Sequence, residues 1–263
     1  MMVVRADFCH RLPGAALVPC GKVIDMRPQI VFLPGLLCDA SVFAHQVASL
    51  SAWSDVKVAD FSGEDSIKGM ARNALSLFEG SISLIGFSMG GRAALEACRI
   101  APDRVSRLCL VDTGTAPARE NEAAMRQPSI DLAWSAGMKA LAAEWLPPKL
   151  HIERATDAAL IGPLTAMVER ASAAQYERHI RALLARPDAS PVLQAIHCPV
   201  LVMVGRQDCW SPLAQHEAMA SITPRSRLVV IEDAGHFVPV EQPEACTAAL
   251  LDWFQFHEQE DGL

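Results

Sequence analysis

The chain has little positive charge, few aromatic residues and no long apolar run. Lys and Arg together number 23 against 30 Asp and Glu, so the formal net charge is −7. Nucleic acids and anionic membrane surfaces are recognised by basic surfaces, and this balance argues against both as partners. No stretch approaches the roughly 18 consecutive apolar residues of a membrane-spanning helix, so the sequence predicts none.

Cysteine motifs are missing as well. The chain has eight cysteines, but none is spaced C-x-x-C and none combines with histidine at zinc-finger spacing. We therefore predict no metal site. The cysteines are predicted to be buried free thiols, as in proteins of a reducing compartment. The predicted location is accordingly the cytoplasm. A reactive thiol at Cys38 or Cys209 is the alternative, because both lie beside the motifs described below.

The first 25 residues carry no clear element. Pro13, Gly14 and Pro19 interrupt an apolar run that makes a poor secretory signal. Met26 lies just before the first predicted strand. Residues 1–25 are therefore predicted to be an N-terminal extension, either a leader or an irregular edge hairpin.

Short apolar runs alternate with segments of helical periodicity. The runs are residues 29–33, 56–59, 82–85, 107–111, 200–204 and 228–231. Helical patterns occupy residues 42–50, 66–78, 89–101, 212–221 and 243–256, with Ser41 as the N-cap of the first. Continuous apolar runs of this length are typical of a sheet that is covered on both faces. The alternation predicts an α/β fold with a doubly wound, mostly parallel sheet.

One spacer is much longer than the others. Residues 115–196 contain helical patterns, broken by prolines, and no convincing strand. We predict that they form an inserted helical cap over the carboxyl ends of the strands, where open α/β sheets bind ligands. Such a lid shapes a pocket and excludes water. Residues 1–114 and 197–263 are the predicted core domain.

The strongest chemical signal is the run G-F-S-M-G-G at residues 86–91. A strand precedes it and a helix follows it, so Ser88 is predicted to sit on a tight turn with its hydroxyl exposed as a nucleophile. Gly86 and Gly90 are needed where the strand and the helix cross closely. The alternative is a glycine-rich loop that holds a small ligand.

A serine nucleophile needs a base, and the base needs an acid to orient it. His236 lies on the loop after the last predicted strand and is the candidate base. Asp208 follows the fifth strand and is the candidate acid. Asp112, after the fourth strand, competes with Asp208, and otherwise caps a turn.

Two backbone N–H groups are predicted to stabilise an oxyanion. Met89 follows the nucleophile at a helix N-terminus, where the helix dipole favours negative charge. The second donor is Leu36, in the loop P-G-L-L-C at residues 34–38, where Gly35 allows a sharp bend. Leu37 is the alternative donor.

These motifs resemble the α/β-hydrolase superfamily. The resemblance rests on L-P-G-L-L-C-D-A-S-V-F, G-F-S-M-G-G, G-R-Q-D-C-W-S-P and D-A-G-H-F-V-P-V-E-Q-P-E, and on the order serine, aspartate, histidine along the chain. It covers residues 29–256 and is similar in detail to small bacterial capped carboxylesterases and enol-lactonases. Two departures weaken a subfamily assignment. Pro34-Gly35 stands where many relatives have His-Gly, and the turn at residues 60–66 has one glycine.

The resemblance implies hydrolysis of a small or medium apolar carboxylic ester or lactone through an acyl-enzyme, without a metal or organic cofactor. Trp134, Met138, Trp210 and Phe237 are the predicted lining of an apolar pocket, with simple packing as the alternative. The only predicted partner is a small-molecule substrate, and monomer and homodimer both stay open.

Other functions remain possible on the same three residues. They are C–C bond hydrolysis, thioester cleavage and cofactor-free perhydrolysis, and a ligand-binding module with negligible turnover is the last alternative. No cluster of Lys and Arg is visible in the sequence of the cap, which argues against a large CoA thioester. Arg92 follows the Ser88 turn and is expected on a helix surface.

Overall fold

The centre of the fold is a six-stranded sheet in which all neighbouring strands are parallel. The computed structural model describes residues 27–261, so the predicted extension at residues 1–25 lies outside the described residues. The strands are β1 (Gln29–Leu33), β2 (Asp55–Val58), β3 (Ile82–Phe87), β4 (Val105–Val111), β5 (Val200–Gly205) and β6 (Ser226–Ile231). Their order is β2-β1-β3-β4-β5-β6, and this doubly wound arrangement confirms the predicted fold class.

Burial along each strand follows its place in the sheet. β3 and β5 lie inside the sheet and are buried at every residue, whereas the edge strand β2 alternates between exposed and half-buried residues. The central strands therefore read as continuous apolar runs in the sequence. β4 and β6 each begin two residues earlier than expected, where polar residues extend the apolar run.

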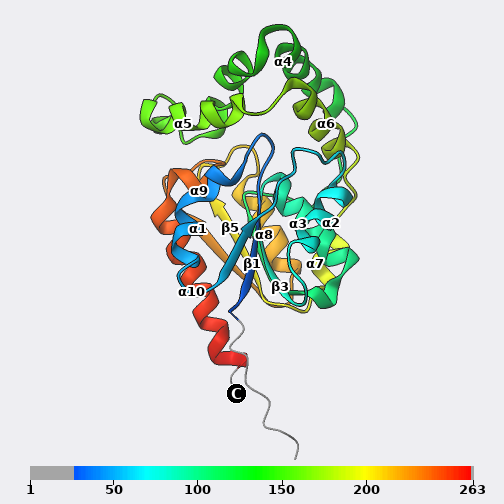
Figure 1. Ribbon diagram of the computed structural model, residues 1–263, viewed down its shortest axis with the longest axis vertical. Helices are drawn as coiled ribbons and strands as arrows, with labels where there is room; N and C mark the ends of the chain where they lie inside the picture. The colour runs from blue at the N-terminus through cyan, green and yellow to red at the C-terminus, as the bar shows by residue number, and fades with distance from the viewer. Residues whose placement is uncertain (1–26, 262–263) are drawn as a thin grey trace, which may run out of the picture.

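Helices cover both faces of the sheet. α1 (Ala44–Leu50) packs against α10 (Pro243–Asp261) on one side, and α2 (Ile67–Ser76) packs against α3 (Met89–Ile100) on the other (Figure 1). The core is completed by α8 (Leu213–Ile222), α9 (Val238–Glu241) and the 3-10 turns η1 (Ala40–Phe43) and η2 (Pro102–Arg104). The N-cap residue of the first helical segment is Asp39 and not the predicted Ser41. The Asp39 side chain accepts the Ser41 N–H at 2.9 Å.

Four helices lie between β4 and β5. They are α4 (Glu122–Trp145), α5 (Ala158–Glu169), α6 (Ala173–Leu184) and α7 (Ser190–Ala195), with the 3-10 turns η3 (Pro147–Lys149) and η4 (Ile152–Arg154). Figure 1 shows α4, α5 and α6 beyond one end of the sheet, whereas α7 packs against α3 and α8 beside it. We call residues 115–196 the insertion. No helix in the described part of the chain is long and apolar enough to cross a membrane.

A largely buried ionic network joins the two ends of the insertion. Arg186, which follows α6, donates to Glu122 at the start of α4 at 2.6 and 2.9 Å. Arg126 donates to the same carboxylate at 2.7 Å. Burial alone would raise the pKa of Glu122, but hydrogen bonds from Arg186 and Arg126 hold it at about 2. The carboxylate therefore stays ionised at the base of the insertion.

We predict that Glu122→Gln lowers the free energy of unfolding by about 2 kcal/mol at pH 7, because two guanidinium groups lose their shared carboxylate. The pKa of Glu122 is lower in the folded chain, about 2, than its ordinary 4.5. Its contribution is therefore complete above pH 4.5 and is lost as the pH falls towards 2.

Urea unfolding of the wild type and the variant between pH 7 and pH 3 measures this difference. The exposed neighbour Glu120, changed to Gln, is the matched control. A stability difference that is absent at pH 7, or that does not shrink in acid, contradicts the prediction.

Candidate active site

Ser88 occupies a strained turn between β3 and α3. Its φ is 52° and its ψ is −113°, a conformation that side chains other than glycine rarely adopt. A Cβ at Gly86 would lie 2.6 Å from the carbonyl oxygen of Gly90, so glycine is needed where strand and helix meet. A Cβ at Gly90 would lie 1.9 Å from the carbonyl oxygen of Leu33, because α3 crosses the end of β1. The turn is held further by the Thr113 hydroxyl, which donates to the Ser88 carbonyl oxygen at 2.7 Å.

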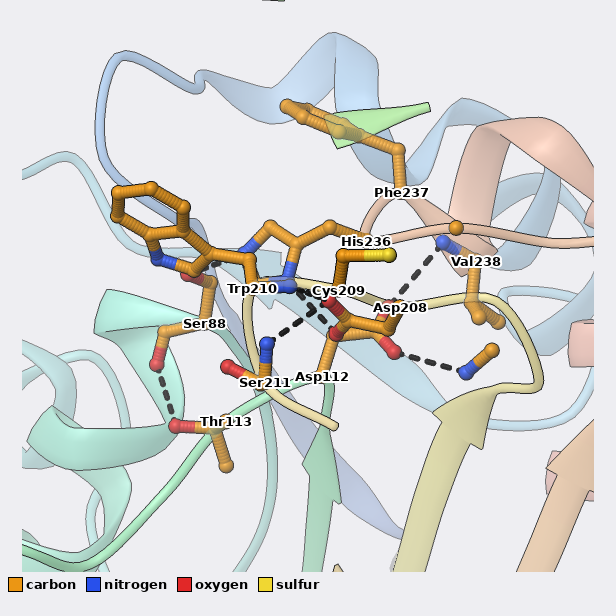
Figure 2. Close-up of polar contacts among 12 residues, drawn as sticks. Ser88, Asp112, Thr113, Asp208, Cys209, Trp210, Ser211, His236, Phe237 and Val238 are labelled. Carbon is orange, nitrogen blue, oxygen red and sulfur yellow. Dashed lines mark hydrogen bonds and ion pairs between the residues drawn. The ribbon is translucent and has the colours of Figure 1, made fainter. Parts of the chain in front are cut away.

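Ser88, His236 and Asp208 form one hydrogen-bonded chain (Figure 2). The Ser88 Oγ lies 2.9 Å from Nε2 of His236, and Nδ1 of the same ring lies 2.8 Å from Oδ2 of Asp208. An imidazole that donates from Nδ1 to a carboxylate presents the lone pair of Nε2 to the hydroxyl. His236 and Asp208 are 3% and 4% exposed, so water competes little for these contacts.

The second oxygen of Asp208 is also occupied. Oδ1 accepts the N–H groups of Trp210 at 2.7 Å and Ser211 at 2.8 Å. Both donors belong to the loop that follows Asp208, so the loop folds back around its own carboxylate. The two bonds fix the orientation in which Oδ2 faces the imidazole.

Asp112, the alternative acid, lies elsewhere. Its Oδ1 accepts the N–H of Gly205 at 3.0 Å and its Oδ2 accepts the N–H of Val238 at 3.1 Å. Burial raises the pKa of this fully buried carboxyl, and the charge of Asp208 raises it further. Asp112 thus ties the end of β5 to the chain just after His236, while Asp208 makes the contact with the imidazole.

A second buried carboxylate, Glu241, supports the loop that carries His236. Oε1 accepts the N–H groups of Gly235 and Phe237, both at 3.0 Å, and these two residues flank His236. Oε2 accepts the N–H of His151 in the insertion at 2.7 Å. The N–H of His236 itself donates to the carbonyl oxygen of Lys149 at 2.7 Å. The main chain on both sides of His236 is therefore held by α9 and by the insertion.

Strained backbone gathers at this edge of the sheet. The non-glycine residues with positive φ in the described chain are Leu37, Ser88, Asp112 and Asp233, with values between 45° and 61°. They follow β1, β3, β4 and β6 respectively. Such conformations cost about 1–3 kcal/mol each and tend to gather at functional sites.

The two predicted oxyanion donors border the same turn. Met89 is the first residue of α3 and is 2% exposed, and Leu36 is 7% exposed. The loop that carries Leu36 is tight, because the N–H of Cys38 donates to the carbonyl oxygen of Gly35 at 3.2 Å. Within residues 27–261, neither the Leu36 N–H nor the Met89 N–H makes a hydrogen bond.

The four predicted pocket residues have different surroundings. Trp134 is 58% exposed, and its Nε1 donates to Glu177 at 2.9 Å. Met138 packs half-buried against the core, and Phe237 is fully buried beside the ring of Trp145 at 6.0 Å. Trp210 is 52% exposed and projects from the loop after Asp208 towards the side of the site where Ser88 lies (Figure 2).

A cavity of about 340 Å³ lies beside the Leu36 loop. It is bounded by the loops after β1 and β2 and by α5 and α6, and its lining includes Leu37, Phe61, Met167 and His179. None of the four residues predicted from the sequence belongs to this lining. The apolar loops and the insertion, which sequence periodicity did not resolve in detail, shape this space.

Cys38, which lies near the site, is not activated. Burial raises the pKa of the Cys38 thiol far above its ordinary value, which disfavours the reactive thiolate. The thiol lies 3.4 Å from the carbonyl oxygen of Leu36. Cys209 is exposed, and all six cysteines in the described part of the chain are free. In the same part of the chain, no group of three or more His, Cys, Asp and Glu side chains is placed to hold a metal ion.

We predict that Glu241→Gln destabilises the loop around His236. A carboxamide has one acceptor oxygen, so its NH2 group must face at least one of the three N–H donors, at a cost of about 1–3 kcal/mol in unfolding free energy. Amide hydrogen exchange at Gly235, Phe237 and His151 is expected to accelerate. Glu244→Gln, an exposed change on α10, is the control. Equal stability and equal exchange rates in the two variants would show that Glu241 does not hold this loop.

Comparison with known proteins agrees with the geometry. The chain is 27% identical to the polyketide synthase ThaQ of Burkholderia thailandensis in an alignment of length 253 that covers 85% of this chain and 12% of that protein. It is 26% identical to 3-oxoadipate enol-lactonase 2 of Acinetobacter baylyi in an alignment of length 241 that covers 85% of this chain and 87% of that one.

The fold and the sequence family lead to the same assignment. A solved thermophilic esterase from Thermogutta terrifontis superposes with a TM-score of 0.78 at 29% identity, covering 88% of this chain and 90% of that one. Residues 30–249 match the model of the alpha/beta hydrolase family. The resemblance predicted from the motifs is therefore confirmed, and the chain belongs to the alpha/beta hydrolase family.

Proposed function

We propose that the protein is a serine hydrolase that cleaves a carboxylic ester or lactone with Ser88, His236 and Asp208. The observation that carries the proposal is the unbroken hydrogen-bonded chain from the Ser88 hydroxyl to the Asp208 carboxylate. Serine becomes an effective nucleophile when a base in this geometry takes its proton. The names of the enol-lactonase and the esterase among the similar proteins support ester or lactone chemistry.

The first half of the reaction forms an acyl-enzyme. Ser88 Oγ attacks the substrate carbonyl carbon while Nε2 of His236 takes the hydroxyl proton. Asp208 keeps the imidazole in the orientation that this transfer needs and stabilises the cation that forms. His236 then gives the proton to the leaving alcohol oxygen, and the bond from that oxygen to the acyl carbon breaks.

The N–H groups of Leu36 and Met89 bind the oxyanion of each tetrahedral intermediate. Their support is that both border the Ser88 turn and make no hydrogen bond within the described chain. A donor of this kind contributes about 10²–10³ in turnover. Donors that are fixed before the reaction stabilise the new charge without reorganisation.

In the second half, water replaces the alcohol. His236 takes a proton from the water, the hydroxide adds to the acyl carbon, and the proton returns to Ser88 Oγ as the carboxylic acid leaves. These steps need no metal or organic cofactor, because the side chains and N–H groups named here supply each proton transfer and stabilise each charge. The insertion acts as a lid that limits water around the intermediate.

The contacts of the insertion support its proposed role as a lid. The insertion reaches the His236 loop through the carbonyl oxygen of Lys149. On the opposite side, Arg178 donates to the carbonyl oxygen of Glu64 and His179 lies 2.8 Å from that of Phe61. Both ends of the site are thus bordered by the same inserted segment.

The test is hydrolysis of p-nitrophenyl esters of increasing acyl length. We predict that Ser88→Ala lowers kcat by about 10⁴-fold or more, because the nucleophile is lost. Ser83→Ala, a buried serine on the same strand, is expected to retain turnover. Covalent labelling of Ser88 by a fluorophosphonate, read by mass spectrometry, checks the same assignment.

Wild-type turnover that survives in Ser88→Ala contradicts the assignment of Ser88. If the wild type shows no ester turnover above Ser88→Ala, an ester hydrolase is ruled out. Lactones, thioesters and substrates with a cleavable C–C bond then distinguish the other reactions from a binding module.

A further inference from the structure

Four cationic side chains gather where the insertion meets the core. They are Arg92 on α3, Arg126 on α4, Lys149 on η3 and Arg186 after α6, and we call them the cationic cluster. Their contacts connect them. Arg92 and Arg186 donate to one carbonyl oxygen, that of Ala116, at 2.8 and 3.1 Å.

Arg186 and Arg126 in turn share the carboxylate of Glu122. Arg126 and Lys149 both approach the Trp210 ring, at 5.8 and 4.3 Å from its centroid. These four residues are far apart in the sequence, so the sequence has no basic run that would predict the cluster. The sequence predicted Arg92 on the helix surface. Its half-buried side chain instead contacts the insertion through the carbonyl oxygen of Ala116.

The cluster carries an excess of positive charge. Glu122 is the one carboxylate paired with it in the described chain, so the cluster holds more positive than negative charge in a chain of net charge −7. Burial lowers the pKa of Lys149 to about 7, with repulsion from Arg126 as a further cause, and only Asp208 opposes this. Burial and repulsion from Arg186 likewise lower the pKa of Arg92 to about 9. Burying cations without enough carboxylates to pair with them is energetically unfavourable. Clusters of this kind, with shifted pKa values, are typical of functional sites.

Lys149 has donors to spare. Its Nζ lies 4.2 Å from the ring centroid of Trp145 and 4.3 Å from that of Trp210, and it donates to the Trp145 carbonyl oxygen at 3.0 Å. An ammonium group has three N–H donors. No carboxylate of the described residues lies within ion-pair distance of Nζ. The remaining donors thus have no anionic partner among residues 27–261.

This part of the cluster adjoins the proposed reaction centre. The N–H of Trp210 donates to Asp208, and the carbonyl oxygen of Lys149 accepts the N–H of His236. Asp208 is not a free counter-ion for Lys149, because both of its oxygens are already engaged by His236, Trp210 and Ser211. Trp210 is 52% exposed and Lys149 is 6% exposed, so the Trp210 ring lies between Lys149 and solvent at the edge of the cluster.

We propose that Lys149 and Arg126 bind a carboxylate carried by the substrate, apart from the carbonyl group that Ser88 attacks. This inference rests on the proposed ester or lactone hydrolysis and narrows it to substrates with a second, anionic group. Such a carboxylate supplies the acceptor that Nζ lacks and offsets the excess charge of the cationic cluster. Because both cations contact Trp210, the anion binds at the Trp210 side of the site.

The experiment compares esters that are matched in size and differ in charge. p-Nitrophenyl butyrate is paired with mono-p-nitrophenyl succinate, and p-nitrophenyl valerate with mono-p-nitrophenyl glutarate. We predict that wild-type kcat/KM favours the anionic ester of at least one pair by about 10–100-fold, the effect of one or two charge-assisted hydrogen bonds.

Variants test which residues cause the preference for the anionic ester. Lys149→Met and Arg126→Gln are each expected to lower the ratio of anionic to neutral kcat/KM by about tenfold, mainly through KM for the anionic ester. Lys149→Arg is expected to restore part of the ratio. Lys139→Met removes the same charge from an exposed position on α4, and its ratio is expected to equal that of the wild type.

The outcomes separate the two proposals. Hydrolysis of the neutral esters without any preference for the anionic ones overturns the carboxylate site and leaves the serine hydrolase intact. A preference that survives in both Lys149→Met and Arg126→Gln also overturns it. Equal losses on both esters would assign Lys149 a structural role, as the residue that caps the end of α4. If Lys149→Met does not fold, the wild-type ratios and Arg126→Gln decide.

Discussion

The imidazole of His236 has to face a hydroxyl on one side and a carboxylate on the other, and much of the surrounding structure meets that requirement. Nε2 and Nδ1 reach Ser88 and Asp208 at 2.9 and 2.8 Å only if the ring and its loop keep one orientation. The ring lies on a loop, where side chains are usually mobile. Glu241 and the carbonyl oxygen of Lys149 together hold three consecutive N–H groups, those of residues 235–237. The loop thereby gains the rigidity of a regular element.

Buried carboxylates provide this order at the carboxyl edge of the sheet. Asp112, Asp208 and Glu241 each accept two or more backbone N–H groups, and each joins segments that are distant or strained. A buried carboxylate is costly unless its oxygens are satisfied. The same bonds hold the loops after β4 and β6, where Asp112 and Asp233 have positive φ. Stability and site geometry therefore depend on the same interactions.

The insertion contributes main-chain contacts to the site. Its segment at residues 149–151 supplies a carbonyl oxygen to His236 and an N–H to Glu241, so the position of the insertion and the orientation of the His236 loop are linked. The end of the insertion that joins the core is held by the ion pairs of Glu122 with Arg186 and Arg126. The cationic cluster at this end of the insertion carries more positive charge than the Glu122 carboxylate balances, although the chain as a whole is acidic. The charge of the cationic cluster is thus opposite in sign to the net charge of the chain.

The sequence alone determined the features that neighbouring residues encode. Apolar runs located all six strands to within about two residues, and the glycine pattern located the Ser88 turn, because periodicity and tight turns depend on residues a few positions apart. It also proposed Ser88, Asp208 and His236 from their places after successive strands. The choice between Asp208 and Asp112 was open, because both follow parallel strands that end at the same edge.

Tertiary structure decided what depends on distant residues meeting. It gave Asp208 the contact with His236 and turned Asp112 towards Gly205 and Val238. It gave Glu241 three backbone donors, although the sequence marks it only as one acidic residue near His236. It also assembled the cationic cluster from four separate segments. Such contacts are set by how the helices pack on the sheet, and no local pattern of residues records that packing.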